Sequence, residues 1–177
     1  QVLMGTGRSD YEIKTGVQTR FASANQEKSA HLDIDYRTHR WGTFTSLTYT
    51  DYDDLRAGAR RSDEFPELGL RNFYIFRNED IDEKIKSADP YIQVGTAYSQ
   101  IDLLQKIRYQ ASDSLYFIWN FQYSTSSDVP RYDNLTDSTN TARNLKWAEW
   151  YYGPQQRMLA SSGASVKISP IARSTSL

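Results

Sequence analysis

The stretch LYFIWNFQYS at residues 115–124 decides the fold class, because its side chains alternate in character along the chain. Its odd positions are all apolar or aromatic: Leu115, Phe117, Trp119, Phe121 and Tyr123. Its even positions include the polar Asn120, Gln122 and Ser124, while Tyr116 and Ile118 break the pattern. Successive side chains of a β-strand point to opposite faces of the sheet, so the stretch predicts a strand with one apolar and one polar face.

The same alternation recurs elsewhere. It is clean in LDIDYR at 32–37, and in IDLLQKIRYQ at 101–110 Ile101, Leu103, Ile107 and Tyr109 share one face, while Asp102, Lys106 and Arg108 lie on the other with Leu104 as the exception. Threonine and aromatic residues fill 41–50, a composition typical of strands. Further strands are expected near 11–22, 92–109 and 145–159. The stretch 78–88 has two isoleucines four residues apart and is expected to be loop or a short helical turn. The sequence therefore predicts an all-β, antiparallel meander.

The connections between these strands alternate in length. Short turns are expected near 39–40 and at 111–114, and long polar stretches occupy 52–91 and 126–144. A meander places the two short turns at one end of the sheet and the two long stretches at the other. Only the short turn at 23–26, which falls at the long-loop end, departs from this rule. Transmembrane β-barrels segregate short periplasmic turns from long extracellular loops in this way.

Composition limits the class of protein. With 21 basic and 22 acidic residues, the chain lacks the basic excess of a nucleic-acid-binding protein. Cysteine is absent, which excludes disulfides and thiolate metal sites. The mean hydropathy of −0.70 and the lack of an apolar run of about 18 residues exclude a helical membrane protein. A barrel strand needs only about 10 residues, of which alternate ones face lipid, so the polarity is compatible with a barrel.

The sequence carries no catalytic motif. We find no nucleophile elbow, phosphate-binding loop or zinc-protease motif, and the only histidines are His31 and His39. Asp33 and Asp35 are expected to point into a wet lumen. Two carboxylate clusters are interpreted as solvated loop, with calcium as the alternative: Asp51, Asp53 and Asp54, and Glu79, Asp80, Asp82 and Glu83. We therefore predict no enzyme, no catalytic residue, no metal site and no cofactor.

Five stretches, in this order along the chain, carry a family resemblance. They are FASANQEKSAHLDIDY (21–36), WGTFTSLTYTDYDDLRAG (41–58), YSQIDLLQKIRYQ (98–110), YSTSSDVPRYDNL (123–135) and AEWYYGPQ (148–155). Together they resemble the early barrel segment, just after the plug domain, of TonB-dependent outer-membrane receptors of the Bacteroidetes type. The resemblance covers 21–160, and SDVPRYD and WYYGPQ are its most distinctive parts. The tail 161–177 does not look like the family's next strand.

The resemblance implies a fold, a function and a location. Residues 1–177 would form part of a barrel domain, contributing about six or seven of about 22 strands. The family sits in the Gram-negative outer membrane and imports a scarce nutrient: a siderophore, haem, cobalamin or glycan. The implied partners are membrane lipid, the nutrient, the protein's own plug domain and the TonB complex. The plug and a signal peptide are expected upstream of Gln1, because the start of the chain has neither.

Two sets of residues are the candidate functional positions. The first is expected to face lipid: Leu115, Phe117, Trp119, Phe121 and Tyr123. The second lies on the long loops and is expected to contact the nutrient: Arg56, Arg60, Arg61, Tyr74, Arg131 and Tyr132. Two alternatives share the strand pattern, namely a passive porin-like barrel and a soluble β-sandwich that binds carbohydrate.

Overall fold

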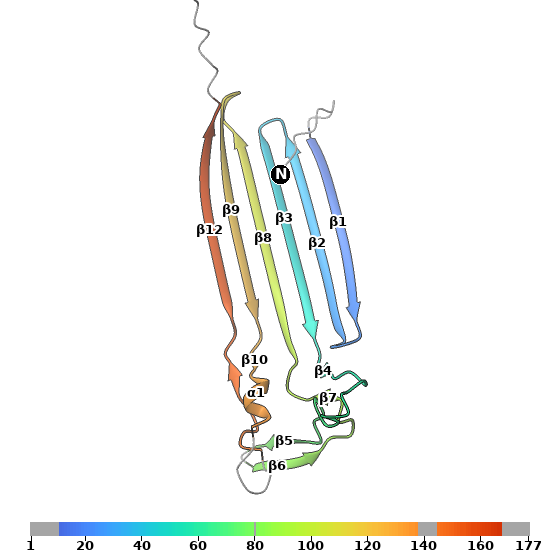
Figure 1. Cartoon of the computed structure of the whole chain (residues 1–177). Coiled ribbons are helices and arrows are strands. Elements are labelled where there is room, and N and C mark those ends of the chain that lie inside the picture. Colours follow the sequence, from blue (N-terminus) through green and yellow to red (C-terminus); the bar gives the residue numbers. More distant parts are fainter. Residues whose placement is uncertain (1–10, 80, 138–144, 168–177) are drawn as a thin grey trace, which may run out of the picture.

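The computed structural model describes residues 11–79, 81–137 and 145–167, and its main feature is one six-stranded sheet (Figure 1). The strands are β1 (Tyr11–Ala22), β2 (Glu27–Thr38), β3 (Trp41–Tyr52), β8 (Tyr98–Gln110), β9 (Leu115–Ser126) and β12 (Gln156–Val166). They pair antiparallel in the order β1-β2-β3-β8-β9-β12, so each strand lies beside the next long strand of the chain. The predicted all-β antiparallel meander is confirmed.

The connections divide between the two ends of the sheet (Figure 1). The short turns after β2 and β8 lie at one end. The turn at 23–26, which needs a positive φ of 47° at Gln26, lies at the other end with both long connections. Three small sheets form within those connections. They pair β4 (Leu55–Arg56) with β7 (Ile92–Gln93), β5 (Phe73–Asn78) with β6 (Ile81–Lys86), and β10 (Val129–Pro130) with β11 (Tyr151–Tyr152). The short helix α1 (Tyr132–Leu135) lies there too.

The interpretation of 78–88 as loop or helical turn is wrong. Residues 81–86 form β6, which pairs with β5 through a turn at Glu79, where φ is 54°. Isoleucines four residues apart fit the two-residue period of a strand as well as a helical turn. The partner strand, FYIFRN, supplies the aromatic and β-branched residues that favour the extended form.

Three further boundaries differ from the expectations. The strand expected at 92–109 begins only at Tyr98, because Gly95 takes a φ of 87° and 92–93 pair with β4 instead. Of the strand expected at 145–159, only 151–152 and 156–159 lie in strands, because Gly153 and Pro154 separate β11 from the long strand that starts at Gln156. The tail does continue the sheet as far as Val166, since 161–166 pair with β9. Residues 168–177 lie outside the described part.

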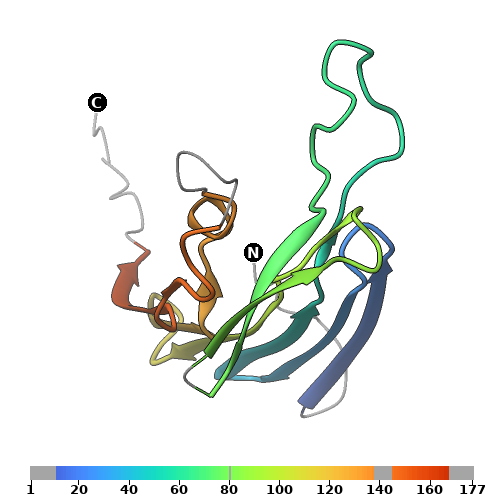
Figure 2. The same ribbon diagram turned by 90° about the horizontal axis from the view of Figure 1, so that it is seen from below.

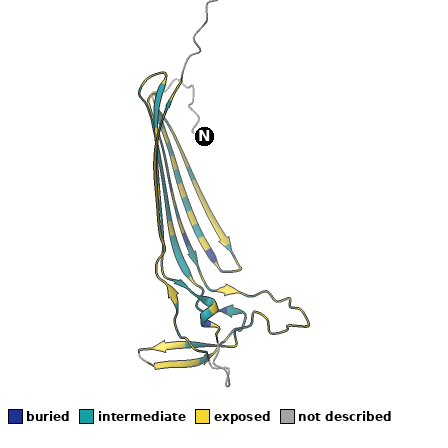
Figure 3. Ribbon diagram, turned by 60° about the vertical axis from the view of Figure 1, so that its left-hand side comes forward, coloured by how far each residue is buried: buried dark blue, intermediate teal, exposed yellow. Residues whose placement is uncertain are grey.

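No second layer covers either face of the six-stranded sheet within the described residues. Among the described residues, the only buried apolar side chain is that of Leu135 in α1, which is 4% exposed. Large apolar side chains on the strands are open to the surroundings, for example Val17 at 77% and Leu47 at 44% (Figure 3). The sheet curves into a trough when seen from the loop end (Figure 2). No helix among the described residues is long and apolar enough to cross a bilayer.

Candidate functional site

One face of the sheet is apolar across all six strands because the register aligns the alternating side chains. A central row joins direct cross-strand partners: Val17, Leu32, Leu47, Leu103, Tyr123 and Met158. The next row toward the short turns contains Ile34 and Phe121, with the polar Thr15, Thr45 and Gln105 between and beside them. The row after that contains Tyr36, Ile107 and Trp119. All five residues expected to face lipid therefore lie on this apolar face.

Aromatic pairs concentrate on the apolar face near the short turns. The ring centroids of Trp41 and Tyr109 are 4.5 Å apart, and those of Phe117 and Trp119 are 5.9 Å apart. Tyr11 and Tyr36 make a looser pair at 6.5 Å. Tyrosine and tryptophan combine an apolar ring with a polar tip, and this suits a boundary between hydrocarbon and water.

The opposite face is polar and its groups bond one another. His31 Nδ1 lies 2.8 Å from Thr48 Oγ1, and His31 Nε2 lies 3.4 Å from Asp33 Oδ1. Asp35 forms an ion pair with Arg37 on the same face. A hollow of about 720 Å³ opens on this side of β3, β8, β9 and β12. Polar side chains of Ser46, Thr48, Gln100, Asp102, Gln122 and Arg157 line it together with the apolar Leu104 and Leu159. Asp33 and Asp35, which were expected to face a lumen, lie on this largely polar face, and the hollow leaves room beside it for solvent or a small ligand.

Two of the candidate loop residues meet at Tyr91. The guanidinium carbons of Arg56 and Arg61 lie 5.7 Å and 4.5 Å from the centroid of its ring. Arg56 Nη1 also lies 2.7 Å from Asp89 Oδ2, and Arg61 Nε donates to the Leu68 carbonyl at 2.9 Å. The backbone N–H of Tyr91, and then Arg56, hold the pKa of Asp89 below its usual value. This part of the loop is a cation–π cluster with one ion pair.

A third candidate, Tyr132, lies in a different contact. Its ring faces Arg71, whose guanidinium carbon is 5.6 Å from the ring centroid, and its hydroxyl donates to Gln93 Oε1. Burial raises the pKa of the Tyr132 phenol, although the positive charge of Arg71 opposes this effect. Tyr132 is therefore half-buried and held between Arg71 and Gln93.

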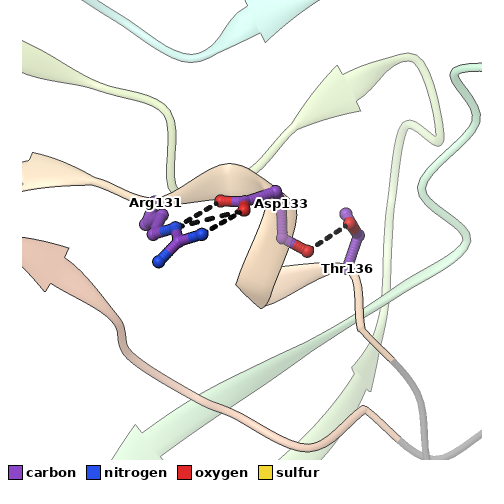
Figure 4. Close-up of polar contacts among 3 residues, drawn as sticks. All are labelled: Arg131, Asp133 and Thr136. Atoms are coloured by element: carbon purple, nitrogen blue, oxygen red, sulfur yellow. Dashed lines mark hydrogen bonds and ion pairs between the residues drawn. The ribbon is translucent and has the colours of Figure 1, made fainter.

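The remaining three candidates are separate from these contacts. Arg131 is ion-paired with Asp133 at 2.8 Å at the start of α1 (Figure 4). Its guanidinium carbon also lies 5.5 Å from the centroid of the Tyr152 ring. Tyr74 is on β5 opposite Ile85. Arg60 is exposed and has no polar partner in the described part of the chain. The structure thus brings only Arg56 and Arg61 together.

Sequence reasoning missed the two residues that hold the loops together. Arg71 is 7% exposed and bonds two loop carbonyls. Asp54, interpreted from sequence as solvated, accepts from the backbone N–H groups of Gly95, Thr96 and Ala97 at 2.9, 2.7 and 3.1 Å. Neither follows a local pattern, because the partners are 23 to 64 residues away in the sequence. Within 11–79, 81–137 and 145–167, no three side chains of the metal-binding types histidine, cysteine, aspartate or glutamate gather around one point.

No protein-family model, no curated protein and no solved structure matches the chain significantly. The functional argument therefore depends on the residues quoted above and on this geometry.

Proposed function

We propose that this chain forms an arc of the transmembrane β-barrel of a TonB-dependent outer-membrane receptor that imports a scarce nutrient. The observation that carries the proposal is a single sheet with one continuous, uncovered apolar face and one polar face. In water such a face would be covered by a second layer, whereas in a bilayer hydrocarbon covers it.

The strand dimensions support this reading. The twelve residues of β3 span about 40 Å, which at a tilt of about 40° is about 30 Å along the membrane normal. This equals the thickness of the hydrocarbon core of a typical bilayer, about 30 Å. The aromatic pairs near the short turns then lie at the periplasmic boundary, and both long connections reach the outside of the cell.

The sheet also needs further strands. β1 and β12 each have one edge without a strand partner in the described residues. In hydrocarbon every unpaired backbone N–H and C=O group costs several kcal/mol, so both edges would be continued by other strands of a larger closed barrel. The polar hollow then faces the lumen, where the family's plug domain resides.

In this proposal the transport cycle makes and breaks no bond in the nutrient. Ligand contact is assigned to the outer loops, with Arg56, Arg60 and Arg61 on the first and Arg131 on the second. Uptake would depend on energy delivered through TonB. A passive porin would transport equally well in cells that lack TonB, and this separates the two membrane readings.

A pair of neighbouring substitutions on β9 tests the membrane assignment. Phe121 lies on the apolar face and Gln122 on the polar face, and both are near the middle of the sheet. In the full-length protein, Phe121→Arg is expected to destabilise the bilayer-inserted barrel by about 2–4 kcal/mol, the cost of arginine facing lipid near the midplane. Gln122→Arg is expected to be tolerated.

The measurement is reversible unfolding from lipid vesicles, followed by tryptophan fluorescence. Equal stability of the two variants would remove the transmembrane reading. A protein that stays monodisperse in buffer without detergent would favour the soluble carbohydrate-binding module instead.

A further inference from the structure

The two long connections are far apart in the sequence but meet at one side chain. Arg71 belongs to the connection between β3 and β8, and it is 7% exposed. Its Nη1 donates to the carbonyl of Val94 in the same connection. Its Nη2 donates to the carbonyl of Leu135, at 3.3 Å, in the connection between β9 and β12. One guanidinium group therefore bonds both loops.

A second set of contacts holds the same two segments together. The Tyr132 hydroxyl donates to Gln93 Oε1, and Gln93 Nε2 donates to the Gly69 carbonyl at 2.6 Å. Gly95 has a φ of 87°, and a Cβ atom there would lie 3.1 Å from Leu135 Cδ1. A side chain at position 95 would therefore require Leu135 of α1 to shift by a few tenths of an ångström and would strain the backbone at this φ.

The environment of Arg71 makes the contact cooperative. Burial lowers the pKa of its guanidinium, while Tyr132 and Asp54 oppose that shift. No carboxylate in the described residues lies within ion-pair distance of Arg71, and its Nε atom has no partner there. The buried charge is balanced by two carbonyl dipoles and the face of the Tyr132 ring. Withdrawal of either loop would take away one of the two carbonyl acceptors that the guanidinium bonds.

We propose that Arg71 is a positioning residue that makes the two outer loops one ligand-binding unit. The inference rests on the proposed function, in which these loops contact the nutrient. Arg71 itself does not touch the ligand, because it is covered. It fixes the separation between the Arg56–Arg61–Tyr91 cluster on one loop and Arg131 on the other. A nutrient that engages either loop is then recognised by both, and loss of Arg71 separates them.

Spin-label distances in the full-length receptor in lipid vesicles test the proposal. This chain has no cysteine, so labels can be placed at Ser62→Cys and Glu149→Cys, both exposed, one on each loop. The native protein is expected to give a single narrow distance distribution. Arg71→Met is expected to broaden it about twofold or more, because two loops that open independently sample more positions. Tyr132→Phe, which removes only the bond to Gln93, is expected to have a smaller effect.

Two controls separate positioning from general damage. A second label pair, His39→Cys with Asp113→Cys, lies on the short turns at the opposite end and should be unchanged by Arg71→Met. Lys86→Gln removes an exposed cation from the same loop, on β6, and should leave the loop distances unchanged. Because Arg71→Met could prevent insertion, Arg71→Lys provides a second variant. It keeps the charge but lacks the fork that bonds two carbonyls, so it should broaden the loop distances and leave the turn distances narrow.

The outcomes are distinct. Loop distances as narrow in Arg71→Met and Arg71→Lys as in the native protein would overturn the inference while leaving the barrel intact. Broadening of both label pairs alike would also overturn it, because Arg71 would then support the whole fold and not the loop pair. Failure of the native protein to insert into vesicles would instead refute the proposed function.

Discussion

Gly16 on β1 lies directly opposite Asp33 on β2, and a Cβ atom at position 16 would come within 2.5 Å of Asp33 Oδ1. The Asp33 carboxylate therefore lies over the neighbouring strand, where only glycine leaves room for it. The same carboxylate is 3.4 Å from His31 Nε2. Gly16 thus makes possible a polar contact that continues along the polar face of the sheet to Thr48.

Gly16→Ala is expected to lower the free energy of unfolding by about 1 kcal/mol, because the added methyl group forces Asp33 out of its rotamer. The double variant Gly16→Ala/Asp33→Ala should recover most of this loss, since the clash is removed. Denaturant unfolding of the vesicle-inserted protein measures both. A neutral or stabilising Gly16→Ala with Asp33 intact would contradict the steric explanation.

Thr45 and Gln105 form the only polar pair in the central rows of the described apolar face. They are direct cross-strand partners, and Thr45 Oγ1 donates to Gln105 Oε1 at 2.7 Å. If this face contacts hydrocarbon, each group depends on the other for its hydrogen bond.

Thr45→Val should therefore destabilise the inserted barrel by about 1–2 kcal/mol, because the Gln105 carbonyl loses its donor. Thr45→Val/Gln105→Leu should be close to the native stability. Thr43→Val, on the same strand and face, serves as the control, because Thr43 has no side-chain hydrogen bond in the described structure. Equal effects of Thr45→Val and Thr43→Val would mean that water, not lipid, solvates this face.

The sheet was predictable from the sequence because its signal is local and periodic. Alternation in 115–124 and 32–37 follows directly from the pleat, and the register then needs only to keep one face apolar. The lengths of the connections then indicated the order in which the strands lie in the sheet. Boundaries at Tyr98 and Gln156 were less predictable, because glycine and short pairings inside the loops end the alternation before the apolar pattern changes.

The loops could not be predicted in the same way. Arg56, Arg61 and Arg131 were selected as cations on long loops, but nothing local indicates that the first two share Tyr91. The contact between Arg71 and α1 joins residues 64 positions apart through a backbone carbonyl. Every residue has a backbone carbonyl, whatever its side chain. No pattern of side chains can therefore reveal such a partner.

Asp54 organises the entry to β8 through backbone N–H groups. One carboxylate oxygen accepts from three successive residues, 95–97. Asp54→Ala is expected to reduce the protection of these amides against hydrogen exchange about tenfold, as loss of a bond worth about 1–2 kcal/mol implies. Asp54→Asn keeps an acceptor and should lose less. Asp53→Ala is the matched control, because the Asp53 side chain accepts only from the adjacent Asp54 N–H in the described structure. Unchanged protection of 95–97 in Asp54→Ala would contradict the assignment.

Asp89 makes the order of the first loop depend on pH. Its pKa is lowered in the folded loop, first by the backbone N–H of Tyr91 and then by Arg56. A carboxylate whose pKa is lower in the folded state than in the unfolded state stabilises the fold at pH values above its ordinary pKa. For aspartate the ordinary pKa is about 3.9. The stabilisation is lost as the pH falls through the pKa of the folded state. The loop should therefore resist proteolysis at pH 5 and become more susceptible as the pH falls below about 3.9, the ordinary pKa of aspartate.

Limited digestion with pepsin between pH 2 and about 5, read by mass spectrometry at 57–70, measures this change. Asp89→Asn removes the titrating group and the charge opposite Arg56, so its loop should be more susceptible at pH 5 and change less between pH 5 and pH 3. Asp82, whose pKa is also lowered, by Arg77, lies in the β5–β6 hairpin and supplies a comparison. Asp82→Asn should leave the pH response of 57–70 as in the native protein. If Asp89→Asn keeps the native pH response instead, the acid sensitivity of this loop comes from another carboxylate, and the Arg56–Asp89 pair does not order it.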